Sequence, residues 1–197
     1  MKIDSHQHFW HFNTEDYGWM GDNMSAIKRD FLPADLLPEL ESIGFDGSVA
    51  VQARQSLEET NWLLELASKN PHIKGVVGWI DLQSADAEAQ LREFAKHTKA
   101  VGVRHVIHDE PELDFMLRPA FIQGVKLLEN YNLAYDILIF EKHLSNTLKF
   151  VSQFSEKQVF VVDHIAKPLI KNNILEPWAE LITQLAHHPT VYCNISG

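Results

Sequence analysis

The chain has 197 residues, 45% hydrophobic and 22% charged, and this ordinary globular composition excludes disordered, collagen-like and disulfide-scaffold proteins. Asp and Glu number 27 against 17 Lys and Arg, and the net charge of −10 argues against nucleic acid or an anionic membrane surface as partner. The lone Cys193 cannot form an intramolecular disulfide, no secretory signal is recognisable, and no apolar run approaches the roughly 20 residues that cross a bilayer. We therefore expect a cytoplasmic protein. No Gly/Ser-rich linker divides the sequence, so we expect one domain over residues 1–197.

Short apolar runs alternate with amphipathic stretches along the whole chain. This alternation is typical of a parallel sheet built from strand–helix–strand units. The apolar runs predict seven strands, at residues 1–6, 45–52, 74–81, 100–107, 133–139, 158–164 and 190–196.

The helices between these runs carry recognisable start and stop signals. Ser56 and Glu59 are spaced as a capping box, so a helix is expected to begin there, and another is expected to end at Ile43 before Gly44. Further helices are predicted near Ser84, after Pro119, and over residues 144–154 and 177–186.

Residues 11–31 interrupt the alternation with a segment too long for a simple connector. Loops of this length are usually functional or disordered. We expect a lid over a pocket, carrying Tyr17 and Trp19. The alternative is a surface excursion packed around its own buried aromatic residues.

Chemistry in parallel α/β folds gathers at the C-terminal ends of the strands. His6 and His8 lie at the end of the first predicted strand, and residues two apart on a strand face the same side. Asp163 and His164 end a buried strand, where unpartnered polar groups would cost several kcal/mol. A site is expected there, and a satisfied Asp163–His164 pair that closes the strand is the alternative.

Three further strand ends carry polar groups, namely Arg54, the pair Arg104 and His105, and Asp136. A guanidinium can offer a planar fork to a carboxylate or to vicinal hydroxyls, and Trp79 can stack on a sugar face. Each of these residues, taken alone, fits a structural role better than a functional one.

Several segments, in order, resemble one known family. They are the run Ile3-Asp4-Ser5-His6-Gln7-His8-Phe9-Trp10, then Val51-Gln52-Ala53-Arg54-Gln55-Ser56, Gly102-Val103-Arg104-His105, Leu117-Arg118-Pro119-Ala120, Asp163-His164-Ile165-Ala166-Lys167-Pro168 and Asn194-Ile195-Ser196-Gly197. Together they resemble the amidohydrolase-related family of L-fuconolactonases and L-rhamnonolactonases.

The resemblance implies a (β/α)8 TIM barrel of the amidohydrolase superfamily that opens a sugar-acid lactone to the free aldonic acid. It implies a small-molecule sugar lactone as partner, and a homo-oligomer is also expected. His6, His8, His105 and His164 are the expected catalytic residues, and His6, His8 and His164 the expected ligands of one divalent metal, zinc. The expected substrate-binding residues are Arg54, Trp79, Arg104, Asp136 and Trp19.

The sequence departs from the family pattern in two places. The fifth strand reads Tyr135-Asp136-Ile137-Leu138 where metal-using members have a histidine, which argues against a binuclear centre and leaves a single zinc or a metal-free site. The chain also stops at Gly197, although a barrel takes about 250 residues. We therefore expect a C-terminally truncated barrel that lacks the eighth strand and its aspartate base.

Two alternatives to a lactonase remain at this point. One is a decarboxylase or another acid hydrolase on the same barrel. The other is a truncated, non-catalytic paralogue that binds a sugar acid, and the absent eighth strand favours it.

Overall fold

The computed structural model describes residues 1–195, and the chain divides into two compact units, Met1–Trp79 and Ile80–Gly197. Ser196 and Gly197, which end the last predicted strand and the last motif of the resemblance, lie outside the described residues. The expectation of one domain over residues 1–197 stays a prediction.

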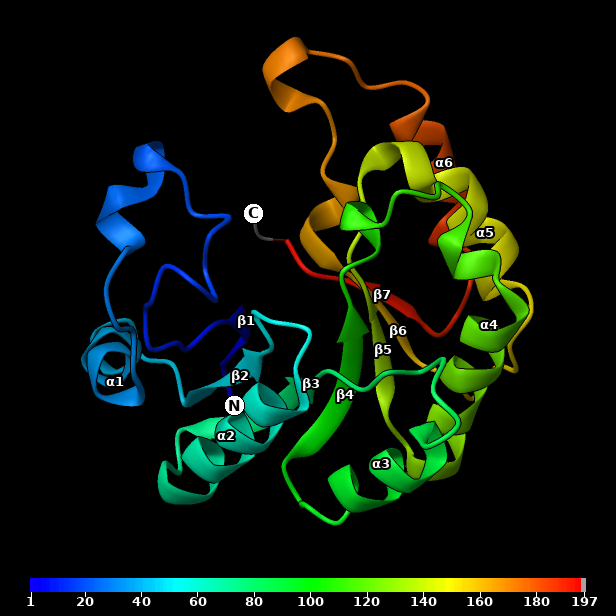
Figure 1. Cartoon of the computed structure of the whole chain (residues 1–197). Helices are drawn as coiled ribbons and strands as arrows, with labels where there is room; N and C mark the ends of the chain where they lie inside the picture. The colour runs from blue at the N-terminus through cyan, green and yellow to red at the C-terminus, as the bar shows by residue number, and fades with distance from the viewer. Residues whose placement is uncertain (196–197) are drawn as a thin grey trace. The chain divides into compact units, whose positions relative to one another are not determined.

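The first unit is a parallel three-stranded sheet with helices after its first two strands (Figure 1). The strands pair in sequence order, with Ile3 opposite Gly47 and Val51 opposite Val77. The face of α2 that carries Leu63, Leu64 and Ala67 is buried, and α2 packs on β3. The elements are β1 (Ile3–Gln7), the 3-10 helix η1 (Asp22–Ile27), α1 (Pro33–Ser42), β2 (Gly47–Val51), α2 (Leu57–Lys69) and β3 (Ile73–Gly78).

The second unit is a parallel four-stranded sheet, also paired in sequence order. Its strands are β4 (Ala100–His105), β5 (Ala134–Ile137), β6 (Phe160–Val162) and β7 (Val191–Cys193). Its helices are α3 (Ala87–Phe94), α4 (Pro119–Lys126), α5 (Leu144–Val151) and α6 (Trp178–Leu185). Six 3-10 segments lie between these elements, at Ile107–Asp109, Phe115–Leu117, Leu127–Tyr131, Glu141–His143, Asp163–Ala166 and Ile170–Asn172.

All seven predicted strands are confirmed and each is shorter than predicted, although β1 ends one residue later and β3 begins one residue earlier than expected. The helix after Ser56 also begins as predicted, because the Ser56 hydroxyl accepts hydrogen bonds from the backbone N–H groups of Glu58 and Glu59. The Glu59 carboxylate reaches further back than a capping box requires and accepts the N–H groups of Ala53 and Arg54. Its role is therefore to fix the turn between β2 and α2.

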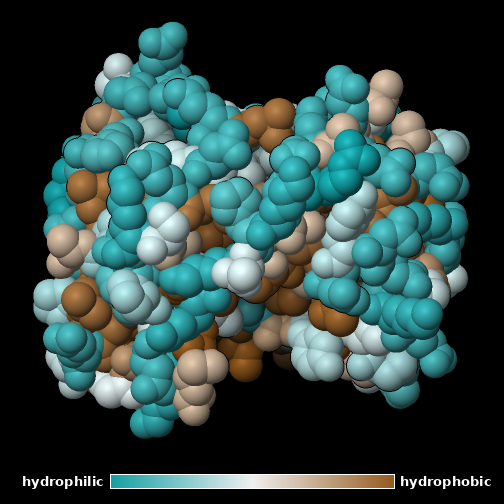
Figure 2. Space-filling model, turned by 90° about the horizontal axis from the view of Figure 1, so that it is seen from below, coloured by the Kyte–Doolittle hydropathy of each residue, from teal (hydrophilic) through white to brown (hydrophobic). Residues whose placement is uncertain are grey.

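Aromatic rings form the centre of the second unit. Phe121, Tyr135, Phe150 and Phe160 are at most 1% exposed and contact one another edge-to-face or at a tilt. Such pairs stabilise a core beyond the area that they bury. The face of the molecule in Figure 2 is mostly hydrophilic, with smaller apolar patches between the polar residues.

No helix within residues 1–195 combines the length and the apolar character that a membrane span needs.

Gly124 tests how tightly α4 packs in the second unit. A β-carbon at this position would collide with the backbone carbonyl of Leu82, which cannot rotate away as a side chain can. We expect Gly124→Ala to lower the free energy of unfolding by about 1–3 kcal/mol despite the higher helix propensity of alanine. Urea unfolding measures this loss. The control is Gly18→Ala, where the nearest atom lies at an ordinary 3.4 Å. Equal stability of the two variants would show that the α4 contact is not tight.

Candidate functional site

Two histidines meet at the C-terminal end of β1. The Nε2 atoms of His6 and His8 are 3.3 Å apart, and their rings lie edge to face with centroids 5.0 Å apart. The predicted placement of both imidazoles on one side of the strand is therefore observed. His8 also lines a pocket of about 420 Å³, together with Phe9 and Arg29.

The tautomer of His8 follows from its neighbour. Nδ1 of His8 lies 2.8 Å from the backbone carbonyl oxygen of Val51, and a carbonyl oxygen can only accept, so Nδ1 carries the proton. In the neutral ring, Nε2 then presents its lone pair toward His6. A backbone carbonyl behind the far nitrogen is the usual support of a metal-binding imidazole.

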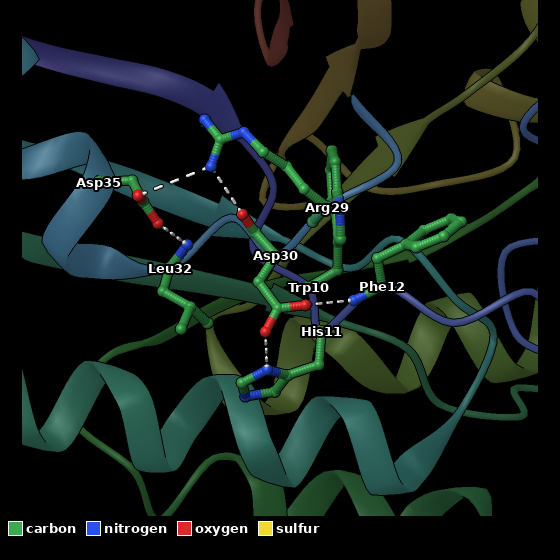
Figure 3. A network of polar contacts seen from close by, with 7 residues as sticks. All are labelled: Trp10, His11, Phe12, Arg29, Asp30, Leu32 and Asp35. Carbon is green, nitrogen blue, oxygen red and sulfur yellow. Dashed lines mark hydrogen bonds and ion pairs between the residues drawn. The ribbon is translucent and has the colours of Figure 1, made fainter. Parts of the chain in front are cut away.

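The polar network in Figure 3 joins the residues directly after β1 to residues 29–35. The Asp30 carboxylate lies 2.9 Å from Nδ1 of His11 and accepts the N–H of Phe12 at 2.8 Å. The Trp10 indole donates to the carbonyl of Arg29. The hydrogen bond from His11 lowers the pKa of Asp30, and the bond from Phe12 adds to this.

Within residues 11–31 a small core forms, as the surface-excursion alternative requires. Trp10, Tyr17 and Met20 are buried, and Phe12 and Phe31 pack against them. Trp19 is not part of this core, and 57% of its surface is exposed. The segment is therefore packed around its own aromatic residues.

The same segment also lines a pocket of about 220 Å³ beside α2. Arg54 and Asp16 form an ion pair of 2.7 Å there, and Trp62 and His11 provide aromatic walls. Burial, and then the Glu59 carboxylate, raise the pKa of Tyr17. Arg54, an expected substrate-binding residue, is thus engaged by a carboxylate of the chain itself.

In the second unit a buried ion pair joins the C-terminal ends of two strands. Nη1 of Arg104, on β4, lies 2.9 Å from Oδ2 of Asp163, which follows β6, and Asp163 is fully buried. Asn194, after β7, donates its side-chain amide to the other carboxylate oxygen at 3.2 Å. Asp136 stands opposite Arg104 in the sheet register and is 3% exposed.

This arrangement determines the charge state of Asp136. Burial, and then the neighbouring Asp163 carboxylate, raise the pKa of Asp136 well above its usual range, and Arg104 opposes them only in part. The raised pKa favours the protonated form of Asp136. A protonated carboxyl can donate a hydrogen bond, which an ionised one cannot.

A left-handed turn follows directly after Asp163. Residues 164–167 have φ angles of 52°, 49°, 58° and 48°, and none of them is glycine. Each such residue costs roughly 1–2 kcal/mol, and conformations of this kind concentrate at functional sites. The turn is secured because Ile165 donates its N–H to the Asn194 carbonyl and accepts the indole N–H of Trp178 on its own carbonyl.

The turn brings Lys167 to His108. Nζ of Lys167 lies 3.3 Å from Nδ1 of His108 and 5.0 Å from the centre of the Phe140 ring. Burial, and then the Lys167 charge, lower the pKa of His108 to about 4, so the imidazole is neutral. Burial also lowers the pKa of Lys167, against the opposing effect of Asp109.

His105 lies apart from this group. It is adjacent to Arg104 on β4, so the two side chains leave opposite faces of the strand. Nε2 of His105 is 2.6 Å from the Glu110 carboxylate, and the ring stacks on Phe115 at 4.9 Å. Burial lowers its pKa, and Glu110 opposes the shift. This environment resembles a structural pair, and the catalytic role of His105 stays a prediction.

Within each unit the structure brings some of the predicted site residues together. It brings His6 to His8, and Arg104 to Asp136, while Trp79 follows β3 and offers its carbonyl to Thr60. Sequence reasoning missed Lys167, His108 and Asn194 as members of the polar group in the second unit. The position of Lys167 three residues after His164 was the available signal.

Asp136 gives a testable pH dependence. Because the pKa of Asp136 is raised in the folded chain, its proton is released at a higher pH than in the unfolded chain, where release occurs near pH 4. Asp136 therefore makes the free energy of unfolding fall as the pH rises above about 4, by at most about 1.4 kcal/mol per pH unit. Asparagine cannot ionise, so we expect Asp136→Asn to weaken this decline above about pH 4. Urea unfolding over a pH series measures it. The exposed Glu156→Gln is the control, and parallel curves for wild type and Asp136→Asn would contradict the assignment.

Comparison with known proteins identifies the family. Residues 3–197 match the family model described as amidohydrolase. The chain is 36% identical to L-fucono-1,5-lactonases of Burkholderia ambifaria and Burkholderia multivorans, and covers 67% and 68% of their lengths. A crystal structure of an amidohydrolase from Burkholderia multivorans with bound zinc matches all of this chain with a TM-score of 0.95 and 36% identity, over 70% of its own length. The predicted (β/α)8-barrel class is thereby confirmed. The chain belongs to the amidohydrolase family.

Proposed function

We propose that the protein is a hydrolase that opens a sugar lactone of the L-fucono-1,5-lactone type to the free aldonic acid. One observation carries this proposal, namely the 36% identity to two proteins named L-fucono-1,5-lactonase over the whole of this chain. A decarboxylase of the same fold resembles this chain at only 10% identity, which concerns the fold alone.

The proposed reaction sets requirements for the site. Water adds to the lactone carbonyl, the bond from that carbon to the ring oxygen breaks, and the ring oxygen leaves as a hydroxyl group. Negative charge develops on the carbonyl oxygen, so the site needs cationic or N–H donors near it. Imidazoles at the end of β1 supply such groups in either a metal-bound or a metal-free site.

The geometry of His6 and His8 fits one divalent cation. Zinc binds imidazole nitrogen at about 2.0–2.1 Å in tetrahedral sites, which places two ligand nitrogens about 3.3–3.4 Å apart. The two Nε2 atoms are 3.3 Å apart, and the Val51 carbonyl holds His8 in the tautomer that such a ligand needs. When bound, a cation polarises the lactone carbonyl as a Lewis acid.

The remaining assignments extend this proposal from the sequence. His164 as a further ligand, His105 as a catalytic group, and Arg54, Trp79, Arg104, Asp136 and Trp19 as substrate-binding residues stay predictions. A cytoplasmic location and a homo-oligomer stay predictions as well.

The first test is lactone hydrolysis by the chain, measured with a pH indicator. We expect turnover of L-fucono-1,5-lactone above that of lactones without sugar hydroxyl groups, because hydroxyl recognition defines the proposed substrate class. Addition of a chelator separates a metal-bound from a metal-free site. Absence of turnover on every sugar lactone tried would contradict the proposed function of this chain.

The second test is zinc binding, which does not depend on turnover. We expect about one zinc ion per chain after dialysis, measured by atomic emission, and a loss of at least tenfold in affinity for the double variant His6→Asn/His8→Asn, since both nitrogen ligands disappear. The exposed His97→Asn is the matched control and should retain the ion. Equal zinc content in the double variant and the control would remove His6 and His8 as ligands.

A further inference from the structure

Lys167 is a half-buried cation whose nearest polar partner is neutral. An ammonium group can only donate, so Nδ1 of His108, 3.3 Å away, must be the acceptor. The proton of His108 is then on Nε2, which lies 3.2 Å from Oδ1 of Asp109. The Asp109 carboxylate thus lies beside His108, and no carboxylate among residues 1–195 contacts the Lys167 ammonium.

The contrast with Arg104 shows what is unusual here. Arg104 is equally a cation at a strand end, but Asp163 neutralises it across 2.9 Å. Lys167 instead lies 5.0 Å from the centre of the Phe140 ring. Burial, and to a smaller extent Arg104, lower the pKa of Lys167, while Asp109 and Asp163 oppose the shift without contacting the ammonium. A half-buried charge that no carboxylate contacts has lost part of its hydration, so an anionic ligand would stabilise it.

The backbone that positions the Lys167 ammonium has an unfavourable conformation. Lys167 is the last of four non-glycine residues with positive φ, and its N–H closes the turn on the His164 carbonyl at 2.8 Å. Strain of this kind persists only where surrounding contacts fix it. Figure 1 shows the segment from β6 to α6 leaving the C-terminal end of the sheet of the second unit, which is the end where this fold class binds ligands.

We propose that Lys167, aligned by His108 on the Phe140 ring, is the subsite for the carboxylate of the open-chain aldonate. This rests on the proposed function, because hydrolysis of a lactone creates a carboxylate that the neutral substrate lacks. One N–H of the ammonium is directed to His108, and the other two are left to donate to the anion. Lys167 is therefore a group that discriminates charged product from neutral sugar.

The test compares a charged with a neutral ligand of the same skeleton. We measure binding of sodium L-fuconate and of L-fucitol, which lacks the carboxylate, by isothermal titration calorimetry to the full chain. We expect Lys167→Met to lower the affinity for L-fuconate by about tenfold to a hundredfold, the range for hydrogen bonds to charged groups. The affinity for L-fucitol should not change. Lys167→Arg, which keeps the charge, should recover most of the affinity. Higher salt should lower the affinity for L-fuconate more in the wild type than in Lys167→Met.

Lys171→Met is the matched control, because it removes an exposed lysine four positions away in the same segment. His108→Asn should weaken L-fuconate severalfold, since the alignment of the ammonium is lost while its charge remains. Thermal melting verifies that each variant is folded. Should Lys167→Met unfold, the comparison is made with Lys167→Gln and Lys167→Arg.

The outcomes separate this inference from the proposed function. Equal L-fuconate affinity in wild type, Lys167→Met and Lys171→Met, with lactone turnover intact, would overturn the subsite and leave the lactonase standing. Inorganic phosphate that binds as tightly as L-fuconate would show a general anion site and overturn the carboxylate assignment. No binding of any aldonate to the wild type, with no lactone turnover, would overturn both proposals.

Discussion

The buried ion pair between Arg104 and Asp163 is the constraint on which the candidate site of the second unit depends. It joins the ends of β4 and β6, and Asn194 extends it to the end of β7. Two desolvated charges rarely add much net stability, but removing one partner leaves the other buried and costs about 3–5 kcal/mol. The pair therefore fixes the register of these strand ends. Its Asp163 carboxylate also adds to the effect of burial, which raises the pKa of Asp136.

The two units present two different kinds of chemistry. The first offers two adjacent imidazoles, with His8 oriented by a backbone carbonyl, and this suits a soft or borderline cation. The second offers one neutralised guanidinium and one ammonium that is left for a ligand. The ammonium suits the carboxylate that the proposed hydrolysis creates.

Much of this could be predicted from the sequence, and the exceptions have physical causes. Alternating apolar runs predicted every strand, and the two-residue spacing of His6 and His8 predicted their common face, because both depend on local periodicity. Glu59 was predicted to cap its own helix, yet it holds Ala53 and Arg54, since the path of the preceding turn is not encoded in spacing. Lys167 was missed because its place depends on a backbone conformation that non-glycine residues rarely adopt.

The left-handed turn also determines at which positions a substitution would change the geometry around Lys167. Ile165 is β-branched, and its positive φ opposes its intrinsic preference, so contacts from elsewhere must impose it. Trp178, thirteen positions further along the chain, and Asn194 provide those contacts. During evolution, loss of the Trp178 indole or a shift of the backbone at Asn194 would alter the geometry around Lys167 without touching any group that contacts a ligand. Drift in α6 and in the segment after β7 is therefore coupled to ligand selectivity, although both look like parts of the scaffold.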